Sequence, residues 1–442
     1  MNRTIFLSLG GNIGNAVETF DAALKHLEIN GVRIIKRSSC AQTSPVDCAP
    51  GTPDFYNMAI TAETELQPFE LLELTQKTEV LFGRPADHGF HESRTLDIDI
   101  IYMEGVQLCT NRLTLPHPRA AERDFVMRFL LELDSDAPAK VRPVKVLTPC
   151  PAPMEGVMTP ALIKTAAEEK LCTEFLTPFM RISEHVPKEK EFRKFLEPYK
   201  NTKTTLQLMG NSPELLSKSA ALAAKFDIAG INLNFGCPSG QVLRHNGGGA
   251  LLKNPLLMRE LCRAVRQSVP DLPLSVKMRL GFDNINEYKN WISDWSMSSN
   301  DAPDFFIIHT RAVKEGYKFV SDKEHLKRSI DFVSSVKQNV ILNGDINDTE
   351  CANKRLLQTG CASFMTGRGW LKNPYLFRNF ELEIHEAADM QTKISLYQTV
   401  LHNADLLGPP YHRGKQIELS QLIFAPSNPF LTELLKCPDK KH

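Results

Sequence analysis

The chain has 442 residues, of which 42% are hydrophobic and 24% charged, and 52 basic side chains balance 52 acidic ones. This length predicts two or three domains, and the composition is typical of a soluble globular protein. No apolar run approaches the length of a membrane span. The first strand-like run meets Gly10-Gly11 at once, which argues against a signal peptide. We therefore expect a cytoplasmic protein that does not contact a membrane.

The cysteines indicate the redox compartment of the protein, and the charge distribution indicates the kind of partner. Ten cysteines are scattered without a C-x-x-C pair or zinc-ligand spacing, which favours free thiols in a reducing compartment. Residues 1–137 carry 12 lysines and arginines against 20 aspartates and glutamates, a net charge of −8, whereas the remainder carries 40 against 32, or +8. This asymmetry suggests different partners for the two parts, with a polyanion more suited to the second.

The first part alternates strands with amphipathic helices, which predicts a small α/β or α+β layered domain. Asn15 is a suitable N-cap for the first helix, because its side chain can accept a backbone N–H. The expected strands cover residues 4–9, 32–39, 55–62 and 95–102, and the expected helices cover 16–27, 68–81 and 123–133.

An acidic pair marks the last of these strands. Successive side chains of a strand point to opposite faces, so Asp97 and Asp99 share one face. Paired carboxylates are hard oxygen ligands that suit Mg²⁺, which also binds nucleotide phosphates. The other interpretation is an exposed strand face that happens to be acidic. Side chains suited to phosphate contacts lie nearby in the sequence, namely Arg84, Arg94, His117 and Arg123.

Six blocks in order resemble 6-hydroxymethyl-7,8-dihydropterin pyrophosphokinase, a folate-biosynthesis enzyme with a ferredoxin-like fold. They are Ser8-Leu-Gly-Gly-Asn-Ile-Gly14, Thr43-Ser-Pro45, Asp54-Phe-Tyr-Asn57, Glu79 with Gly83-Arg84, Arg94-Thr-Leu-Asp-Ile-Asp-Ile100, and Leu115-Pro-His-Pro with Arg123-Asp-Phe125. The resemblance implies transfer of a pyrophosphoryl group from ATP to the pterin hydroxymethyl oxygen.

The same resemblance implies a role for each matched residue. Asp97 and Asp99 would hold Mg²⁺ ions that neutralise the phosphates. Arg84, Arg94, Arg123 and His117 would stabilise charge on the transferred group. The pterin would lie in a slot formed by Thr43, Pro45 and Asn57, between the rings of Phe55 and Phe125, with Glu79 on the nucleotide side.

The chain departs from this family at two places. His91-Glu92-Ser93 precedes Arg94 where the family often has an aromatic residue and Gly-Pro, and the chain lacks the family's last twenty or so residues. We expect a domain over residues 1–137 and a proline-containing linker over 138–143. A non-catalytic appendage, or a piece that docks RNA, remains the alternative for this trimmed module.

The second part contains eight strand-like runs with intervening helical stretches, which predicts a (β/α)₈ barrel over residues 144–380. In such a barrel the active site lies at the carboxyl ends of the strands. The expected strands are 144–147, 173–176, 205–208, 230–234, 274–277, 305–309, 340–342 and 363–365, and the expected helices are 213–225, 255–269, 285–297, 324–337 and 348–358.

Polar and glycine residues follow these strands at the positions that the barrel requires. The loop after the fourth strand contains Cys237 and the glycines 247–249, whose backbone could approach a ligand closely. A buried structural cysteine beside a flexible loop is the simpler interpretation of that loop alone. The other strand ends supply Pro153, Met154, Glu155, Gln207, Lys277, Arg279, His309, Asn343, Gly344, Asp345, Gly367 and Arg368.

These motifs resemble the flavin-dependent tRNA-dihydrouridine synthases, most closely the bacterial C-type branch. The matching blocks are Ala152-Pro-Met-Glu-Gly156, Leu206-Gln-Leu208, Asn234-Phe-Gly-Cys-Pro238, Gly247-Gly-Gly-Ala-Leu-Leu252, Val276-Lys-Met-Arg-Leu-Gly281, His309-Thr-Arg311, Asn343-Gly-Asp-Ile346 and Gly367-Arg-Gly369. The resemblance implies that FMN, reduced by NADPH, delivers hydride to C6 of a uracil that is turned out of tRNA.

Residue roles follow from the same resemblance. Cys237 would protonate C5 as a neutral thiol, and Arg279 would contact the substrate. Lys277, His309 and Gln207 would bind the isoalloxazine ring, with Pro153, Met154 and Glu155 beside it. The ribityl chain and phosphate would be held by Asn343, Gly344, Asp345, Gly367 and Arg368.

The family ends in a helical domain that grips tRNA, and residues 381–442 are a short counterpart. A helix is expected over 390–407, followed by a basic stretch, Arg413-Gly-Lys415-Gln416. Two alternatives stay open for the whole chain: the barrel belongs to another FMN oxidoreductase, of the dihydroorotate or ene-reductase type, or the first domain is not catalytic. The sequence does not indicate the oligomeric state.

Overall fold

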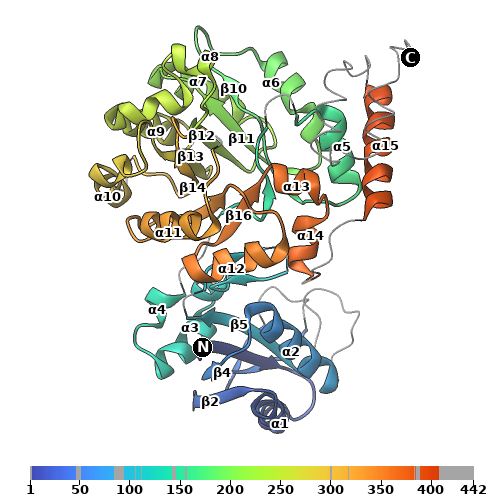
Figure 1. Ribbon diagram of the computed structural model, residues 1–442. Helices are drawn as coiled ribbons and strands as arrows, with labels where there is room; N and C mark the ends of the chain where they lie inside the picture. Colours follow the sequence, from blue (N-terminus) through green and yellow to red (C-terminus); the bar gives the residue numbers. More distant parts are fainter. Residues whose placement is uncertain are drawn as a thin grey trace. The chain divides into compact units, whose positions relative to one another are not determined.

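The computed structural model describes residues 2–45, 51–83, 94–104, 106–110, 112–141, 146–154, 157–298, 301–316, 318–382, 384 and 389–407. The chain divides into two compact units, Met1–Val144 and Lys145–His442 (Figure 1). Within the described ranges, no helix combines the length and apolar character needed to cross a bilayer.

The first unit is built on an antiparallel sheet with the strand order β2-β4-β1-β5. The short strand β3 pairs with the first residues of β4, Phe55 to Asn57. Strands and helices follow one another as β1-α1-β2-β4-α2-β5, which is the ferredoxin-like arrangement. The strands are β1 (Arg3–Gly11), β2 (Val32–Arg37), β3 (Ala41–Thr43), β4 (Phe55–Thr64), β5 (Asp97–Met103), β6 (Leu108–Cys109) and β7 (Thr114–Leu115), and the two crossover helices are α1 (Ala16–Ile29) and α2 (Pro68–Leu81).

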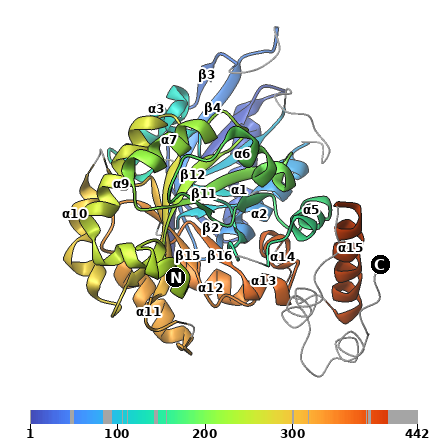
Figure 2. The same ribbon diagram turned by 90° about the horizontal axis from the view of Figure 1, so that it is seen from above.

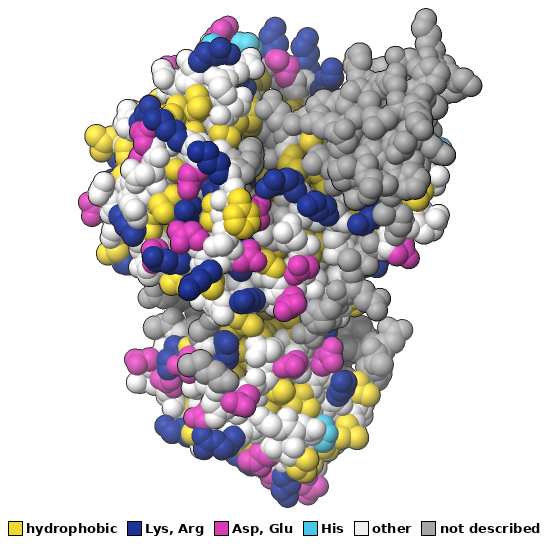
Figure 3. Space-filling view, viewed as in Figure 1, with side chains coloured by type: hydrophobic (Ala, Val, Ile, Leu, Met, Phe, Trp, Pro, Cys, Tyr) yellow, Lys and Arg dark blue, Asp and Glu magenta, His cyan; other side chains and the backbone are white. Residues whose placement is uncertain are grey.

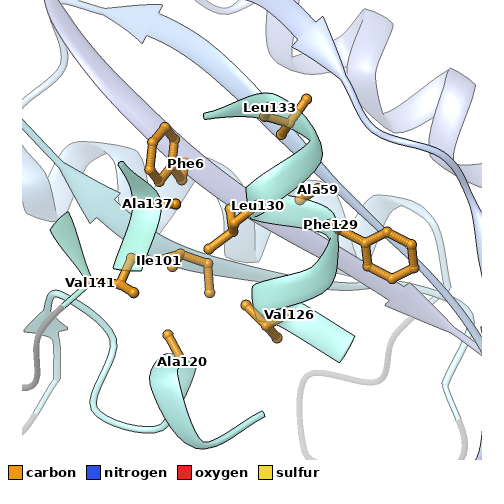
Figure 4. Packing of buried hydrophobic residues seen from close by; sticks show 10 residues of the cluster. All are labelled: Phe6, Ala59, Ile101, Ala120, Val126, Phe129, Leu130, Leu133, Ala137 and Val141. Atoms are coloured by element: carbon orange, nitrogen blue, oxygen red, sulfur yellow. The ribbon is translucent and has the colours of Figure 1, made fainter. Parts of the chain in front are cut away.

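One face of this sheet is covered by the helical segments that follow β7. These are η1 (Ala120–Glu122), α3 (Asp124–Leu133) and α4 (Ala137–Lys140). Apolar residues recur along α3 at helical spacing, and Val126, Phe129 and Leu130 pack on Phe6 and Ile101 of the sheet (Figure 4).

The structure differs from the expected linker over 138–143. Residues 137–140 form α4, and Ala137 and Val141 are fully buried in the same apolar cluster. Pro138 is compatible with this helix because it lies in the first turn, where its missing N–H has no helical partner. The proline therefore starts a helix here and does not mark a loop.

The second unit is a nearly closed parallel barrel, which confirms the expected fold class. The strands pair in chain order from β11 to β16, β16 pairs with β8, and β9 pairs with β11. The helices lie around the strands (Figure 2). The barrel strands are β8 (Cys150–Pro151), β9 (Glu174–Leu176), β11 (Lys203–Met209), β12 (Gly230–Phe235), β13 (Leu274–Gly281), β14 (Phe305–Ala312), β15 (Asn339–Asn343) and β16 (Ser363–Thr366), and β10 (Met180–Arg181) extends beside β11.

The first barrel strand lies later than expected. The expected strand was 144–147, of which residues 144 and 145 lie outside the described residues, but the residues that pair with β16 are Cys150 and Pro151. Just before β8, Thr148 is bound by a side chain of the next strand. The buried Glu174 carboxylate accepts hydrogen bonds from the Thr148 amide at 2.8 Å and from its hydroxyl at 3.1 Å. A side chain thus links the region before β8 to β9.

The remaining helices cover the barrel, and the predicted helix over 390–407 is present with the same limits as α15 (Met390–Leu407). Asn403 joins α15 to α5 by donating to the Thr165 hydroxyl at 2.9 Å. The basic stretch at 413–416 lies outside the described residues. The other helices are α5 (Pro160–Glu168), α6 (Glu189–Leu196), η2 (Glu197–Tyr199), α7 (Pro213–Ala223), α8 (Gly240–Arg244), η3 (Gly248–Lys253), α9 (Pro255–Ser268), η4 (Glu287–Asn290), α10 (Ile292–Met297), α11 (Asp322–Val333), α12 (Thr349–Thr359), α13 (Arg368–Lys372) and α14 (Leu376–Glu381).

Candidate active sites

A cavity of about 540 Å³ opens at the carboxyl ends of the barrel strands. Glu155 lies outside the described residues. Every other site residue expected for the barrel lines this cavity: Pro153, Met154, Gln207, Cys237, Lys277, Arg279, His309, Asn343, Gly344, Asp345, Gly367 and Arg368. Strand ends scattered over more than 200 residues of sequence therefore meet in one place, as the barrel requires.

Cys237 sits in a tightly held turn after β12. The side-chain oxygen of Asn234 accepts from the Gly236 amide at 3.0 Å and from the Cys237 amide at 2.9 Å. The Gly249 amide donates to the Cys237 carbonyl at 3.0 Å. A Cβ on Gly248 would come within 3.0 Å of the Cys237 Cβ, and Gly248 has a φ of +54°. These glycines pack against Cys237 and are absent from the cavity lining among described residues, whereas the sequence suggested ligand contact.

A chain of buried amides continues from this turn through the barrel interior. Asn234 donates to the Gln207 oxygen, Gln207 donates to the Asn232 oxygen, and Asn232 donates to the Ser275 hydroxyl, each at 2.8 Å. The bonds fix which end of each amide carries the nitrogen. Sequence reasoning assigned no role to Asn232, Asn234 or Ser275. The signal that could have found them is a pair of asparagines two residues apart in an otherwise apolar strand.

Two basic side chains from β13 differ in their surroundings. Burial, followed by the positive charge of Arg279, lowers the pKa of Lys277 to about 8. Within the described part of the chain, the Lys277 ammonium has no hydrogen-bond or ion-pair partner. The Arg279 guanidinium instead donates to the carbonyls of Gly236, Ala312 and Gly316 at 3.0 to 3.2 Å. Arg279 thus ties the ends of β12 and β14 together, whereas Lys277 lines the cavity without such partners among the described residues.

His309 lies within β14, in its carboxyl-terminal half, and Asp345 follows β15. Burial lowers the pKa of His309 well below its ordinary value, and the neighbouring cations of Arg279, Lys277 and Arg311 act in the same direction. The pKa of the Asp345 carboxyl is lowered by hydrogen bonds from His325 and Arg311 and by the charge of Arg368. At neutral pH the histidine is therefore uncharged and the aspartate ionised.

Backbone forms the wall of the cavity at two glycines. Gly344 has a φ of +142°, and a Cβ there would lie 3.2 Å from the His309 ring. A Cβ on Gly367 would lie 2.6 Å from the Met154 sulfur. Larger residues would displace both neighbours, so the glycines keep this wall open for a ligand.

The second candidate site lies on the sheet of the first unit. Gly10 of β1 is paired with Asp97 on one side and with Asn57 on the other, and Ser8 is paired with Asp99. Residues directly opposite in antiparallel strands share a face. Asp97, Asp99 and Asn57 therefore lie on one face of the sheet. This is the face on which Ala59 and Ile101 pack against α3. A Cβ on Gly10 would lie 2.8 Å from the Asn57 side-chain oxygen, so glycine is needed between the carboxylates and the amide.

Each of these carboxylates contacts an arginine. Asp97 pairs with Arg94 at 3.3 Å, and Asp99 pairs with Arg123 at 3.0 Å. The pKa of His117 is lowered by burial, against the charge of Asp99, so the histidine is neutral at pH 7. Arg84 lies outside the described residues. Among described residues no cluster of three or more acidic, histidine or cysteine side chains could hold a metal, so any cation here would take further ligands from substrate or water.

Three more of the predicted residues lie beside this face, namely Thr43, Phe55 and Phe125. Asn57 donates to the Thr43 hydroxyl at 2.7 Å, and the Arg94 guanidinium carbon lies 5.7 Å above the Phe55 ring centre. Phe125 and Pro45 are half-buried. Glu79, expected beside the nucleotide, is buried and accepts from the Ile98 amide at 2.6 Å. It holds β5 between the two aspartates.

Comparison with known proteins finds a family for each part of the chain. Residues 150–418 match the dihydrouridine synthase family, which covers more than half of the chain. The chain belongs to this family. Residues 6–135 match the 7,8-dihydro-6-hydroxymethylpterin-pyrophosphokinase family. The chain is thus a fusion of a pyrophosphokinase module and a dihydrouridine synthase, and it is an enzyme.

Curated relatives match the synthase part. The tRNA-dihydrouridine(16) synthase of Haemophilus influenzae is 34% identical over 233 residues, 51% of this chain and 74% of the relative. That of Pasteurella multocida is 35% identical over 236 residues, 51% of this chain and 73% of the relative. Morphinone reductase, a solved structure, aligns with a TM-score of 0.39 and 11% identity over 56% of this chain and 88% of its own, a likeness too weak to carry an argument.

Proposed function

We propose that the barrel reduces uridine 16 of tRNA to 5,6-dihydrouridine, with FMN as cofactor and NADPH as reductant. The observation that carries this proposal is the single cavity in which Cys237, Lys277 and His309 meet. The position in tRNA is taken from the names of the relatives. The family match favours this reaction over those of other FMN oxidoreductases.

The cavity is chemically suited to FMN. A half-buried lysine without a counter-charge among described residues favours an electron-rich ring or an anion, and glycine backbone at Gly344 and Gly367 leaves room for close approach. Lys277, His309 and Gln207 would hold the ring, and Asn343 and Arg368 the polar chain. When bound and reduced, FMN supplies a hydride to C6 of the uracil.

Cys237 then completes the reaction as a general acid. Hydride addition at C6 builds negative charge at C5, and the Cys237 thiol donates its proton there. The Asn234 oxygen and the Gly249 amide fix the Cys237 backbone. Holding the thiol in place before the uracil arrives lowers the entropic cost of the proton transfer.

The test is to express the chain in cells that lack dihydrouridine and to map reduced uridines in their tRNA. Dihydrouridine at position 16, together with a yellow purified protein that NADPH bleaches, is expected. A colourless protein or unmodified tRNA would refute the proposal. A yellow protein that modifies another position would change only the assigned uridine.

We also propose that the first unit transfers pyrophosphate from ATP to 6-hydroxymethyl-7,8-dihydropterin. The specific observation is the row Asp97, Gly10 and Asn57 across three strands, with Arg94 and Arg123 on the carboxylates. Mg²⁺ is often held by one or two carboxylates plus substrate phosphates, so Asp97 and Asp99 suffice. The pterin would occupy the slot near Thr43, Pro45, Asn57, Phe55 and Phe125.

The corresponding test is AMP formation from ATP, hydroxymethyldihydropterin and Mg²⁺ by the purified full chain. AMP release that depends on the pterin is expected. Its absence would favour the alternative in which the trimmed module is a non-catalytic appendage.

A further inference from the structure

Arg311 lies two residues after His309 on β14. It is a buried cation whose guanidinium N–H groups contact three partners. Its side chain is 1% exposed. The Nη1 group contacts the His309 Nε2 at 3.0 Å, Nη2 donates to the Asp345 carboxylate at 2.6 Å, and Nε donates to the Lys318 carbonyl at 3.1 Å. It does not line the cavity, so any effect on a ligand must pass through these partners.

The contact with His309 has a chemical consequence. A guanidinium has five N–H donors and no acceptor. The His309 Nε2 therefore has to accept, and a neutral ring must then carry its proton on Nδ1. His309 is buried among cations that disfavour its charged form. Within the described residues Nδ1 has no hydrogen-bond partner, so its N–H is available to a ligand in the cavity that His309 lines.

Asp345 fixes the other side of the guanidinium. Its carboxylate also accepts from Arg368 at 2.6 Å and contacts the His325 Nε2 at 3.4 Å. The second nitrogen of His325 lies 2.5 Å from the Thr310 hydroxyl. Arg311 and His325 are each 1% exposed, and this chain of polar contacts leaves Arg311 little freedom to turn away from His309.

We propose that Arg311 is a positioning residue that holds His309 in the Nδ1–H form, so that the ring donates a hydrogen bond to the bound cofactor. The identity of the acceptor as flavin rests on the function proposed above. The tautomer itself does not. The competing explanation is that Arg311 only anchors the segment that follows β14, through its bond to the Lys318 carbonyl.

Ring ¹⁵N spectra of the full chain, loaded with FMN and labelled on histidine, test the proposal. The chain has 12 histidines, and His309→Gln identifies the signal that belongs to His309. The expected wild-type result is a neutral ring protonated on Nδ1. A ring protonated on Nε2, or a doubly protonated ring, would overturn the proposal without any Arg311 variant.

Variants separate positioning from anchoring. Arg311→Met removes the donor, so the Nε2–H form should appear, whereas Arg311→Lys retains a donor and should keep the Nδ1–H form. Arg328→Met is the matched control, because Arg328 binds the Thr310 carbonyl and Glu315 of the same region but not His309. An unchanged tautomer in Arg311→Met would overturn the proposal.

A rate measurement links the tautomer to the reaction. Reduction of the bound flavin by NADPH should slow about tenfold in Arg311→Met, equivalent to about 1.4 kcal/mol for one lost hydrogen bond, and should stay near wild type in Arg328→Met. An equal loss in both variants would support the anchoring explanation. Failure to modify tRNA, with the expected tautomer, would refute the proposed function and leave the role of Arg311 intact.

Discussion

The two sites differ in how their charges are balanced. On the sheet of the first unit, each carboxylate has an arginine beside it, Asp97 with Arg94 and Asp99 with Arg123, and all four side chains are partly exposed. In the barrel, Lys277 is half-buried and has no counter-charge among described residues, and its pKa is lowered to about 8 by burial and by the charge of Arg279. Figure 3 adds that lysines and arginines on the visible barrel face are interspersed with acidic side chains and do not form one basic stripe.

The difference reflects what each site is proposed to bind. Mg²⁺ and a nucleotide bring charges of both signs. Each carboxylate can therefore give up its arginine for Mg²⁺ while the arginine takes a phosphate, so that every charge keeps an opposite charge beside it. An electron-rich flavin brings no cation, so the barrel has to supply one and keep it unneutralised. Partial burial of Lys277 does this, and the amide chain from Ser275 to Asn234 ends on the backbone amide of Cys237, the proposed acid.

The largest expected effect separates the two sites completely. Asp97→Asn together with Asp99→Asn should reduce AMP formation below detection, because Mg²⁺ loses both protein ligands. Dihydrouridine formation should remain at the wild-type rate. Asp21→Asn, which removes another aspartate paired with an arginine in the same unit, should leave both activities unchanged. A parallel fall of both activities in the double variant would mean that the sites are coupled.

Removal of the proposed acid comes next. Cys237→Ala should slow uridine reduction by roughly 10²- to 10⁴-fold, the usual contribution of general acid catalysis, while FMN content and bleaching by NADPH are retained. Single-turnover formation of dihydrouridine in tRNA measures the effect. Cys351→Ala, a partly exposed cysteine on α12, serves as the control. Turnover at the wild-type rate in Cys237→Ala would remove Cys237 from the mechanism.

The unneutralised lysine predicts a pH dependence. As the pH rises through about 8, Lys277 loses its proton, and the affinity for FMN should fall by the worth of one charged hydrogen bond, about 1.5–3 kcal/mol. Fluorescence titration of the apoprotein with FMN between pH 7 and 9.5 measures this. Lys277→Arg should be insensitive to pH over that range because a guanidinium stays charged. If the affinity of Lys277→Arg for FMN fell in the same way, the pH dependence would belong to a group other than Lys277.

The smallest effect concerns the amide chain. Asn232→Leu should lower the free energy of unfolding of the barrel by about 1–3 kcal/mol, because Gln207 and Ser275 each lose a buried partner. The chain has three tryptophans, and all of them lie in the second unit at positions 291, 295 and 370. Urea unfolding followed by tryptophan emission therefore reports on the barrel. Asn211→Leu, which removes an exposed bond to His245, should cost less than about 0.5 kcal/mol. Equal losses would contradict the special role of the buried chain.

The sequence by itself determined the two folds, the order of most elements and many of the residues around the barrel cavity. Strand periodicity placed Asp97 beside Asp99, and a parallel barrel brings all its strand ends to one side, so residues as distant as Met154 and Arg368 could be assigned to one site. The first barrel strand was expected over 144–147 but lies at Cys150–Pro151, because composition alone does not specify which residues pair with β16.

Only the tertiary structure decided which polar groups serve a ligand and which serve the protein. Lys277 and Arg279 are two residues apart on one strand, yet Arg279 is occupied by three carbonyls while Lys277 is not. Glu79 turned out to hold β5, the glycines after Cys237 to pack against it, and Arg311 to face His309. Hydrogen-bond partners are set by neighbours in space, and local sequence does not encode them.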